Sequence, residues 1–381
     1  MGSGRRWVFA AVLVTALLLL FGVPWWVLVF AGPDWPGAVE VGGTVLFVAV
    51  AVAFPVLMYL GHRRAGRDWA ARIADTTLGV VWVLFAWSVL ANVARIVLAL
   101  AGVANPARSR IVAAIVVAVV VVLVVWGVVE AMRVPRVRTV EVTIPRLGPG
   151  LDGTRVVVLA DTHFGPIDRA SWSAATAAAV NDLGPDVICH AGDIADGTVG
   201  QRRAQAAPLG TLDARLAKVY VTGNHEYFGA AQEWLDHMSE LGWQSLHNRH
   251  VVVDRGGDRL VLAGIDDATA RSSGLAGHGA DIDSALAGAP DGAPVLLVAH
   301  QPSQVTTAAA AGVDLQVSGH THGGQIWPFH YLVRADQPSV HGLSRHGERT
   351  QLYTTRGAGF WGPPLRVFAP SEISLLILRA G

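Results

Sequence analysis

Four apolar stretches near the start of the chain are each long enough to cross a lipid bilayer. A helix needs about 20 apolar residues to span the hydrocarbon core. We place the spans at residues 7–31, 38–60, 77–101 and 111–131. The last contains IVVAVVVVLVVW, which is too apolar and too long for a soluble helix. A secretory signal is the rival interpretation of the first stretch, because Arg5 and Arg6 precede it, but a clear cleavage site is lacking. The sequence therefore predicts a membrane region over residues 1–132.

Arginines beside the spans predict the orientation of the chain, because loops on the cytoplasmic side carry an excess of basic residues. With four spans, one side would carry Arg5, Arg6, Arg63, Arg64, Arg67, Arg72, Arg133, Arg136 and Arg138. The opposite side would carry Arg108 and Arg110. We therefore expect a multi-pass cell-membrane protein whose amino terminus and C-terminal domain are both cytoplasmic. An odd number of spans would place that domain on the other side.

The rest of the chain predicts one globular domain over residues 151–381, joined to the spans by a linker over 133–150. The linker is rich in proline and basic residues, although RTVEVTI within it alternates as a strand would. The formal net charge is zero, so bulk electrostatic attraction to nucleic acid is not expected. Cys189 is the only cysteine, which excludes a disulfide within the chain.

Six apolar runs in this domain each end in acidic, amide or imidazole residues. They are TRVVVLAD, PDVICHAGD, AKVYVTGNHE, DRLVLAGIDD, APVLLVAHQP and VDLQVSGHTH. Helical patterns between them, such as ASWSAATAAAVNDLG and residues 201–216, favour a largely parallel sheet covered by helices. The later runs TQLYTTRGAG and EISLLILR have no helix between them and indicate a second sheet. The predicted fold class is a layered α/β sandwich.

Polar residues form five groups at the ends of these predicted strands. In chain order they are Asp161 and His163; Asp193 and Asp196; Asn224, His225 and Glu226; His300; and His320 and His322. Each group alone is more typical of a turn, a helix cap or a surface. Ligands of open α/β sheets gather beyond the carboxyl ends of strands. We therefore interpret the five groups together as one metal site.

The residue types narrow the choice of metal. Carboxylate, imidazole and amide oxygen suit divalent ions such as Mn, Fe or Zn, and the absence of cysteine from these five groups excludes a structural thiolate zinc site. Asp193 could bridge two ions, because a carboxylate has two oxygens. Glycines flank His320 and His322 and permit the sharp loop that would direct these histidines at two different ions.

The spacing D-x-H, GD-x-x-D, GNH-E, H and GH-x-H resembles the signature of the calcineurin-like metallophosphoesterase superfamily, over about residues 152–381. The stretches GVDLQVSGHTHGGQ and GFWGPPLRVFAPSEI are similar to its membrane-associated branch, represented by the bacterial YkuE and YaeI proteins. ADTHFG departs from relatives at two positions, neither of which is a ligand. The resemblance implies a four-layer α/β/β/α sandwich with a binuclear metal centre.

The resemblance also implies roles for individual residues. One metal would be held by Asp161, His163, Asp193 and His322, and the other by Asp193, Asn224, His300 and His320. A hydroxide bridging the two ions would attack phosphorus in line, while His225 would stabilise or protonate the leaving group. Asp196 and Glu226 would orient these side chains rather than bind metal.

Other residues are weaker candidates. Trp327, Phe360 and Trp361 would either line a groove for an apolar part of the substrate or pack in the core. We expect His190 to be a packed core histidine. Asp266 and Asp267 would either support the site or begin a loop, and we favour the loop. The remaining histidines have no matching spacing, and we expect them to be exposed: His247, His250, His278, His330, His341 and His346.

These observations favour a membrane-anchored hydrolase with two divalent metal ions that cleaves a phosphodiester or pyrophosphate bond. The membrane tether suggests a lipid or lipid-linked substrate. One alternative is a scaffold or signalling module that uses the same fold to bind proteins, although such modules tend to lose ligands. Another is a four-span sensor or transporter with an accessory phosphoesterase domain, for which Arg95 within the third span is the main support.

Overall fold

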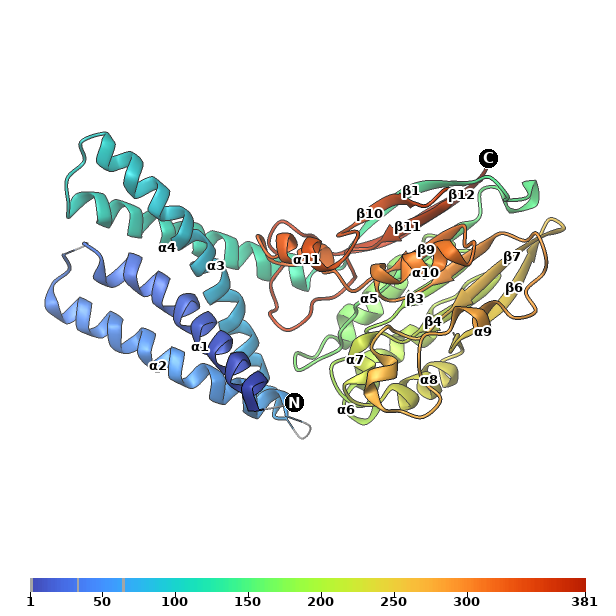
Figure 1. The fold of residues 1–381 in the computed structure, drawn as a ribbon, viewed down its shortest axis with the longest axis horizontal. Helices are drawn as coiled ribbons and strands as arrows, with labels where there is room; N and C mark the ends of the chain where they lie inside the picture. The colour runs from blue at the N-terminus through green and yellow to red at the C-terminus, as the bar shows by residue number, and fades with distance from the viewer. Residues whose placement is uncertain (1–2, 33, 64–65) are drawn as a thin grey trace. The chain divides into compact units, whose positions relative to one another are not determined.

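A computed structural model describes residues 3–32, 34–63 and 66–381, and the chain forms two compact units (Figure 1). One unit comprises residues 1–129 together with 362–367, and the other comprises 130–361 together with 368–381. Arg64, which entered the orientation argument, lies outside the described residues. The side chains of Arg5 and Arg6 are likewise outside the described part of the chain.

The helical unit contains four helices that are long and apolar enough to cross a membrane, as predicted. Their bounds are α1 Ser3–Trp25, α2 Gly37–His62, α3 Asp68–Leu100 and α4 Ala107–Met132, with a π-helical turn at Trp26–Phe30. The third helix begins at Asp68 rather than at residue 77. Its first turns are rich in alanine, and they pack so closely on α2 that a side chain on Gly61 would meet Cα of Ala71 at 2.6 Å.

Residues 362–367 belong to the helical unit although they are distant from the four helices in sequence. Leu365 fills the space beside two helix glycines: a methyl group on Gly79 would lie 2.4 Å from its side chain, and one on Gly127 would lie 3.2 Å away. The backbone N–H of Arg366 donates to the carbonyl of Gly127 at 3.0 Å. The two glycines therefore provide the room in which this segment packs on α3 and α4.

The second unit is built on two six-stranded sheets (Figure 1). The first has the order β1 (Arg136–Ile144), β12 (Glu372–Ala380), β2 (Arg155–Leu159), β3 (Val187–Ala191), β4 (Ala217–Val221) and β5 (Gln244–Ser245). The second has the order β10 (Gly342–His346), β11 (Thr350–Thr354), β9 (Leu315–Ser318), β8 (Val295–Val298), β7 (Asp258–Gly264) and β6 (Arg249–Arg255). Strands β2 to β5 are mutually parallel, as are β7, β8, β9 and β11.

Alternating side chains of these strands bury on opposite faces, which gives four layers. In β2, Val156 and Val158 enter the core between the sheets, whereas Val157 and Leu159 pack under helices on the outer face. Those helices are α5 (Ala170–Asn181), α6 (Val199–Ala206) and α8 (Ala231–Glu240). The outer face of the second sheet packs against α9 (Ile282–Leu286) and α10 (Val305–Ala310). The predicted α/β/β/α class is confirmed.

Short helices complete the domain: α7 (Asn224–Tyr227), α11 (His330–Asp336), and 3₁₀ turns at Pro149–Leu151, Ala207–Thr211, Ala270–Ser273, Pro302–Gln304 and His322–Gly324. The stretch that we assigned to a linker, residues 133–150, contains β1, where RTVEVTI alternates as a strand would, and β1 pairs with β12 over its whole length. The helix expected over 201–216 is divided between α6 and the turn at Ala207–Thr211, because Pro208 interrupts it.

Candidate metal centre

The polar groups at the ends of the strands converge in the folded domain. Asp161 follows β2, Asp193 follows β3, Asn224 follows β4, His300 follows β8, and His320 follows β9. The backbone there is unusual, because five residues that are not glycine have positive φ angles between 41° and 71°: Asp161, His163, Asp193, His320 and His322. Such conformations cost free energy and persist only where the surrounding structure enforces them, which is typical of functional sites.

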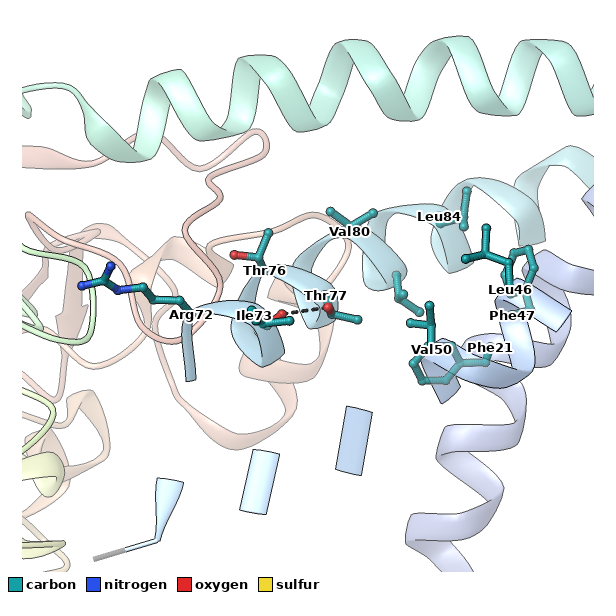
Figure 2. A pocket seen from close by; sticks show the side chains of 11 residues that line it. Phe21, Leu46, Phe47, Val50, Arg72, Ile73, Thr76, Thr77, Val80 and Leu84 are labelled. Atoms are coloured by element: carbon teal, nitrogen blue, oxygen red, sulfur yellow. Dashed lines mark hydrogen bonds between the residues drawn. The ribbon is translucent and has the colours of Figure 1, made fainter. Parts of the chain in front are cut away.

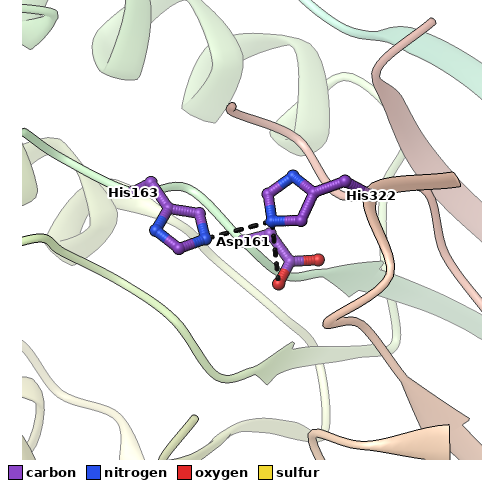
Figure 3. A group of neighbouring side chains, drawn as sticks. All are labelled: Asp161, His163 and His322. Atoms are coloured by element: carbon purple, nitrogen blue, oxygen red, sulfur yellow. Dashed lines mark hydrogen bonds and ion pairs between the residues drawn. The ribbon is translucent and has the colours of Figure 1, made fainter. Parts of the chain in front are cut away.

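One group of side chains consists of Asp161, His163 and His322 (Figure 3). Nε2 of His163 lies 3.1 Å from Nε2 of His322, and Nε2 of His322 lies 3.8 Å from Oδ1 of Asp161. All three residues are buried. Imidazole nitrogens that face each other beside a carboxylate are the donor set of a divalent metal.

A second group consists of Asp193, His300 and His320, with Asn224 beside them. Oδ1 of Asn224 lies 3.1 Å from Nε2 of His300 and 2.9 Å from Nδ1 of His320. Oδ2 of Asp193 lies 3.2 Å from Nε2 of His300. The same oxygen lies 3.5 Å from Nε2 of His163, so Asp193 stands between the two groups.

Neighbouring acceptors fix which ring nitrogens can receive a metal. Nδ1 of His300 donates to the carbonyl of Ala191 at 2.7 Å, which leaves the Nε2 lone pair facing Asp193. Nδ1 of His163 donates to Asp196 at 3.1 Å, which directs its Nε2 toward His322. Histidines that bind metals are commonly oriented in this way. The residues present therefore fit two divalent ions, one in each group.

Burial and charge act in opposite directions on the site's titratable groups. Burial raises the pKa of Asp161, although His300 opposes that shift. Burial would also raise the pKa of Asp193, but His300 and His225 outweigh it and hold that pKa well below its usual range. Burial lowers the pKa of His225, whereas Asp193 and Asp196 raise it more strongly, to about 9. The site thus holds buried carboxylates that cations would stabilise.

The two predicted supporting carboxylates contact different partners. Oδ1 of Asp196 accepts from Nδ1 of His225 at 2.6 Å as well as from His163. Glu226 is buried and accepts from the backbone N–H groups of Asp193, Ile194 and Gly223, at 3.0, 2.8 and 2.7 Å. Asp196 therefore positions two histidines, and Glu226 joins the loops that follow β3 and β4.

The three aromatic candidates have different environments. Trp361 is 47% exposed, and its ring lies 5.9 Å from the ring of His225. Phe360 is buried under the guanidinium of Arg169, 4.3 Å from its ring centre, so it packs in the core. Trp327 is half-buried. Phe228, which sequence reasoning missed, is 72% exposed and lies 5.0 Å from the ring of His225.

Arg169 was also missed, because no motif includes it. Its guanidinium is buried and donates to the carbonyl oxygens of Thr162 and His163. These two hydrogen bonds hold the backbone of the D-x-H loop. Its ring contacts, with Phe164 and Trp172, are close in sequence, but their spacing matches no motif that marks a buried arginine.

Two expectations about other histidines have different outcomes. His190 is a packed core histidine, as expected: it is fully buried beside Tyr220 and Trp243, and burial lowers its pKa to about 3. Of the six histidines expected to be exposed, only His341 is, whereas the other five are half-buried: His247, His250, His278, His330 and His346. His247 and His278 also have a shared partner. They meet at the buried Asp266, with ring centres 4.5 Å apart.

An apolar pocket in the helical unit contains none of these residues. Figure 2 shows it between α1, α2 and α3, lined by side chains such as Phe21, Val50 and Leu84. Of the described residues that line it, Arg72 is the only charged one. Among the described residues, its lining provides no set of metal ligands.

Comparisons with known proteins agree with this geometry. Residues 154–324 match the family model described as calcineurin-like phosphoesterase. A transmembrane protein with metallophosphoesterase domain from Danio rerio is 39% identical over 263 residues, covering 68% of this chain and 60% of the relative. An uncharacterized metallophosphoesterase from Helicobacter pylori is 34% identical over 253 residues, covering 66% of each chain.

The predicted resemblance to YkuE is also found. The uncharacterized metallophosphoesterase YkuE of Bacillus subtilis is 28% identical over 239 residues, covering 61% of this chain and 81% of YkuE. The match spans about 60% of the length of the transmembrane relatives. The chain therefore carries, behind four membrane-capable helices, a domain of the calcineurin-like metallophosphoesterase family.

Proposed function

We propose that the protein is a membrane-anchored phosphoesterase that uses two divalent metal ions to hydrolyse a phosphodiester or pyrophosphate bond. The observation that carries this proposal is the position of Asp193 between two sets of ligands. Its Oδ2 lies within 3.5 Å of a histidine from each set, His163 and His300. A carboxylate in that position suits a shared ligand of two ions.

The metal ligands would be the residues of the two groups, Asp161, His163, Asp193 and His322 in one and Asp193, Asn224, His300 and His320 in the other. When bound, two such ions activate water and stabilise the oxygens of an in-line displacement at phosphorus. Mn, Fe and Zn all suit this donor set.

His225 would act as the general acid for the leaving group. Its side chain is 14% exposed, so a substrate can reach it, and Asp196 holds its Nδ1. Nε2 is then the atom that would donate a proton to the departing oxygen. Because the pKa of His225 is raised to about 9, the imidazolium form persists at neutral pH.

A lipid or lipid-linked substrate is supported by the residues around His225. Phe228 and Trp361 are exposed aromatic side chains beside His225, where they would contact an apolar group of the substrate. Trp361 is also followed directly in the chain by Gly362, the first residue of the segment that packs with the membrane-capable helices. Both features would favour the binding of an amphipathic substrate.

The catalytic domain would face the cytoplasm. Arginines are concentrated at the amino terminus, between α2 and α3, and after α4, whereas Arg108 and Arg110 lie in the first turn of α4, at its opposite end. A reporter enzyme fused after Gly381 tests this placement. Activity of a reporter that works only outside the cytoplasm would contradict it.

The catalytic proposal is tested with full-length protein purified in detergent, loaded with Mn²⁺ and supplied with bis-p-nitrophenyl phosphate. We expect hydrolysis by the wild type. His225→Ala should lose about 10²–10⁴-fold in kcat and keep its metal, whereas Asp193→Ala should lose both activity and metal. If metal-loaded wild type were inactive on both phosphodiesters and pyrophosphates, the proposal that the protein is a phosphoesterase would be refuted.

The substrate class is tested separately. Matched phosphodiesters with and without an acyl chain should differ in KM, the acylated one binding more tightly. Trp361→Ala should abolish that difference while leaving turnover of the short substrate intact. Equal KM values for the two substrates would exclude the lipid preference without affecting the phosphoesterase assignment.

A further inference from the structure

Outside the candidate centre, a second cluster of metal-binding side chains is formed by His247, Asp266 and His278. One ligand atom from each lies within 4.8 Å of the other two. His247 follows β5, Asp266 follows β7, and His278 lies in the loop before α9. Three segments that are separate in the chain therefore present metal ligands to one point.

The distances suit a small divalent cation. Nδ1 of His247 lies 2.6 Å from Oδ1 of Asp266, and Nδ1 of His278 lies 3.8 Å from Oδ2 of the same carboxylate. Zinc bonds of about 2.0–2.1 Å place the ligand atoms of a tetrahedral ion roughly 3.3 Å apart. The observed separations lie on either side of that value, so a small side-chain adjustment would complete the site.

The hydrogen bonds of His278 leave a lone pair for a metal. Its Nε2 lies 3.2 Å from Oε1 of Gln232, which can only accept, so Nε2 carries the proton. Its Nδ1 lies 3.0 Å from the hydroxyl of Tyr227 and is therefore an unprotonated acceptor. That atom is the one closer to Asp266, and 97% of the His278 side chain is shielded from solvent. Burial and the neighbouring His247 also lower the pKa of His278, which favours the neutral ring.

Asp266 is held by further donors, as carboxylates that bind metals commonly are. It is 1% exposed, and its Oδ2 accepts from the backbone N–H of Gly279 at 2.9 Å and from Nδ2 of Asn248 at 3.4 Å. Its hydrogen bond with His247 raises the pKa of that histidine. A bound cation would displace the proton that His247 now donates.

We propose that His247, Asp266 and His278 form a further divalent-metal site, with the donor set of zinc. Three protein ligands leave a fourth position for water or for the nearby hydroxyl of Tyr227. Tyr227 ends α7, the helix that begins at Asn224 and carries His225. With Tyr227 as the fourth ligand, the ion would therefore connect this helix to the segments that carry Asp266 and His278. This site is additional to the proposed function and does not depend on it.

The test counts zinc in a background that lacks the main centre. Full-length Asp193→Ala protein in detergent is stripped with a chelator, equilibrated with excess Zn²⁺, passed through a zinc-free column and analysed for its elements. We expect it to retain one zinc ion per chain. Adding His247→Ala should remove that ion, and His250→Ala, a matched change of another half-buried histidine bonded to the carbonyl of Ala285, should not.

The outcomes separate this site from the catalytic proposal. The proposed zinc site would be overturned by equal zinc content in Asp193→Ala and in the variant that also carries His247→Ala, or by no zinc in either protein. Circular dichroism confirms folding of each variant, and His247→Gln replaces His247→Ala if the latter unfolds. In otherwise wild-type protein, Co²⁺ should give the visible absorption of a four-coordinate ion, reduced but not abolished by His247→Ala. Phosphoesterase activity enters neither readout.

Discussion

Asp196 accepts a hydrogen bond from His225, with 2.6 Å between Oδ1 and Nδ1. The same oxygen also accepts from Nδ1 of His163 at 3.1 Å. One carboxylate thus orients a proposed metal ligand and the proposed general acid. Asp196 stabilises the charged form of His225, so removing its charge should affect both the rate of catalysis and its dependence on pH.

Asp196→Asn should lower kcat about 10–100-fold, as loss of a residue that orients metal-site histidines commonly does. In the wild type, Asp193 and Asp196 raise the pKa of His225 to about 9 against the effect of burial. An acid must be protonated to act, so activity should fall as the pH rises through that value. Without the Asp196 carboxylate the pKa decreases, and the alkaline limb of kcat/KM should move to lower pH.

The pH profile distinguishes this role from a purely structural one. Asp213→Asn, a change of an exposed aspartate, should leave both kcat and the position of the alkaline limb unchanged. An Asp196→Asn enzyme with a reduced rate but an unshifted alkaline limb would show that Asp196 does not set the pKa of His225.

Glu226→Ala should destabilise the domain, because Glu226 accepts from three buried backbone N–H groups, those of Asp193, Ile194 and Gly223. Buried donors without a partner cost about 1–3 kcal/mol each, so we expect the free energy of unfolding to fall by at least about 3 kcal/mol. The melting temperature followed by circular dichroism should fall by roughly 6–12 °C. Glu233→Ala on the exposed face of α8 should change stability by less than about 0.5 kcal/mol. Equal melting temperatures for the two variants would contradict the role of Glu226.

Much of the fold and of the candidate site was predictable because each signal was local. An apolar run followed by Asp, Asn or His marks the end of a strand, and the carboxyl ends of parallel strands meet at one edge. That reasoning predicts one shared site for five residues: Asp161, Asp193, Asn224, His300 and His320. The strand β1 also has a local signal, the alternation of RTVEVTI, but its pairing with β12 has none, because β12 lies at the far end of the chain.

The features that sequence reasoning missed have no recognisable pattern in the sequence. His247 and His278 have no shared spacing, and only the fold brings both to Asp266. Arg169 contacts carbonyl oxygens of the D-x-H loop, which carry no sequence signal. The positive φ angles of Asp161 and His163 are likewise imposed by surrounding structure, since such angles are uncommon for residues other than glycine.

Gly357→Ala should weaken metal binding. Gly357 has a φ of +76°, and a methyl group there would lie 2.7 Å from Oδ2 of Asp161 and 2.8 Å from its Cβ. Asp161 would have to move, and we expect roughly 10–100-fold weaker metal affinity, measured by titration of the stripped protein. Gly288 provides the matched control, because its φ is +77° and its methyl group would meet nothing within 4 Å. Gly288→Ala should cost about 1 kcal/mol of stability and leave metal affinity unchanged. Equal metal affinities for the two variants would exclude this contact as the cause.

Cys189 should be inert in the folded protein. It lies fully buried in β3, and burial raises the pKa of its thiol to about 12. At pH 8 only about one thiol in 10⁴ would be ionised even if a reagent reached it. A thiol-specific chromogenic disulfide should therefore label no cysteine in native protein and one per chain after denaturation. Asp291→Cys, at an exposed loop position, should add one rapidly reacting thiol under native conditions. Rapid labelling of the native wild type would mean that β3, the strand that positions Asp193, opens to solvent.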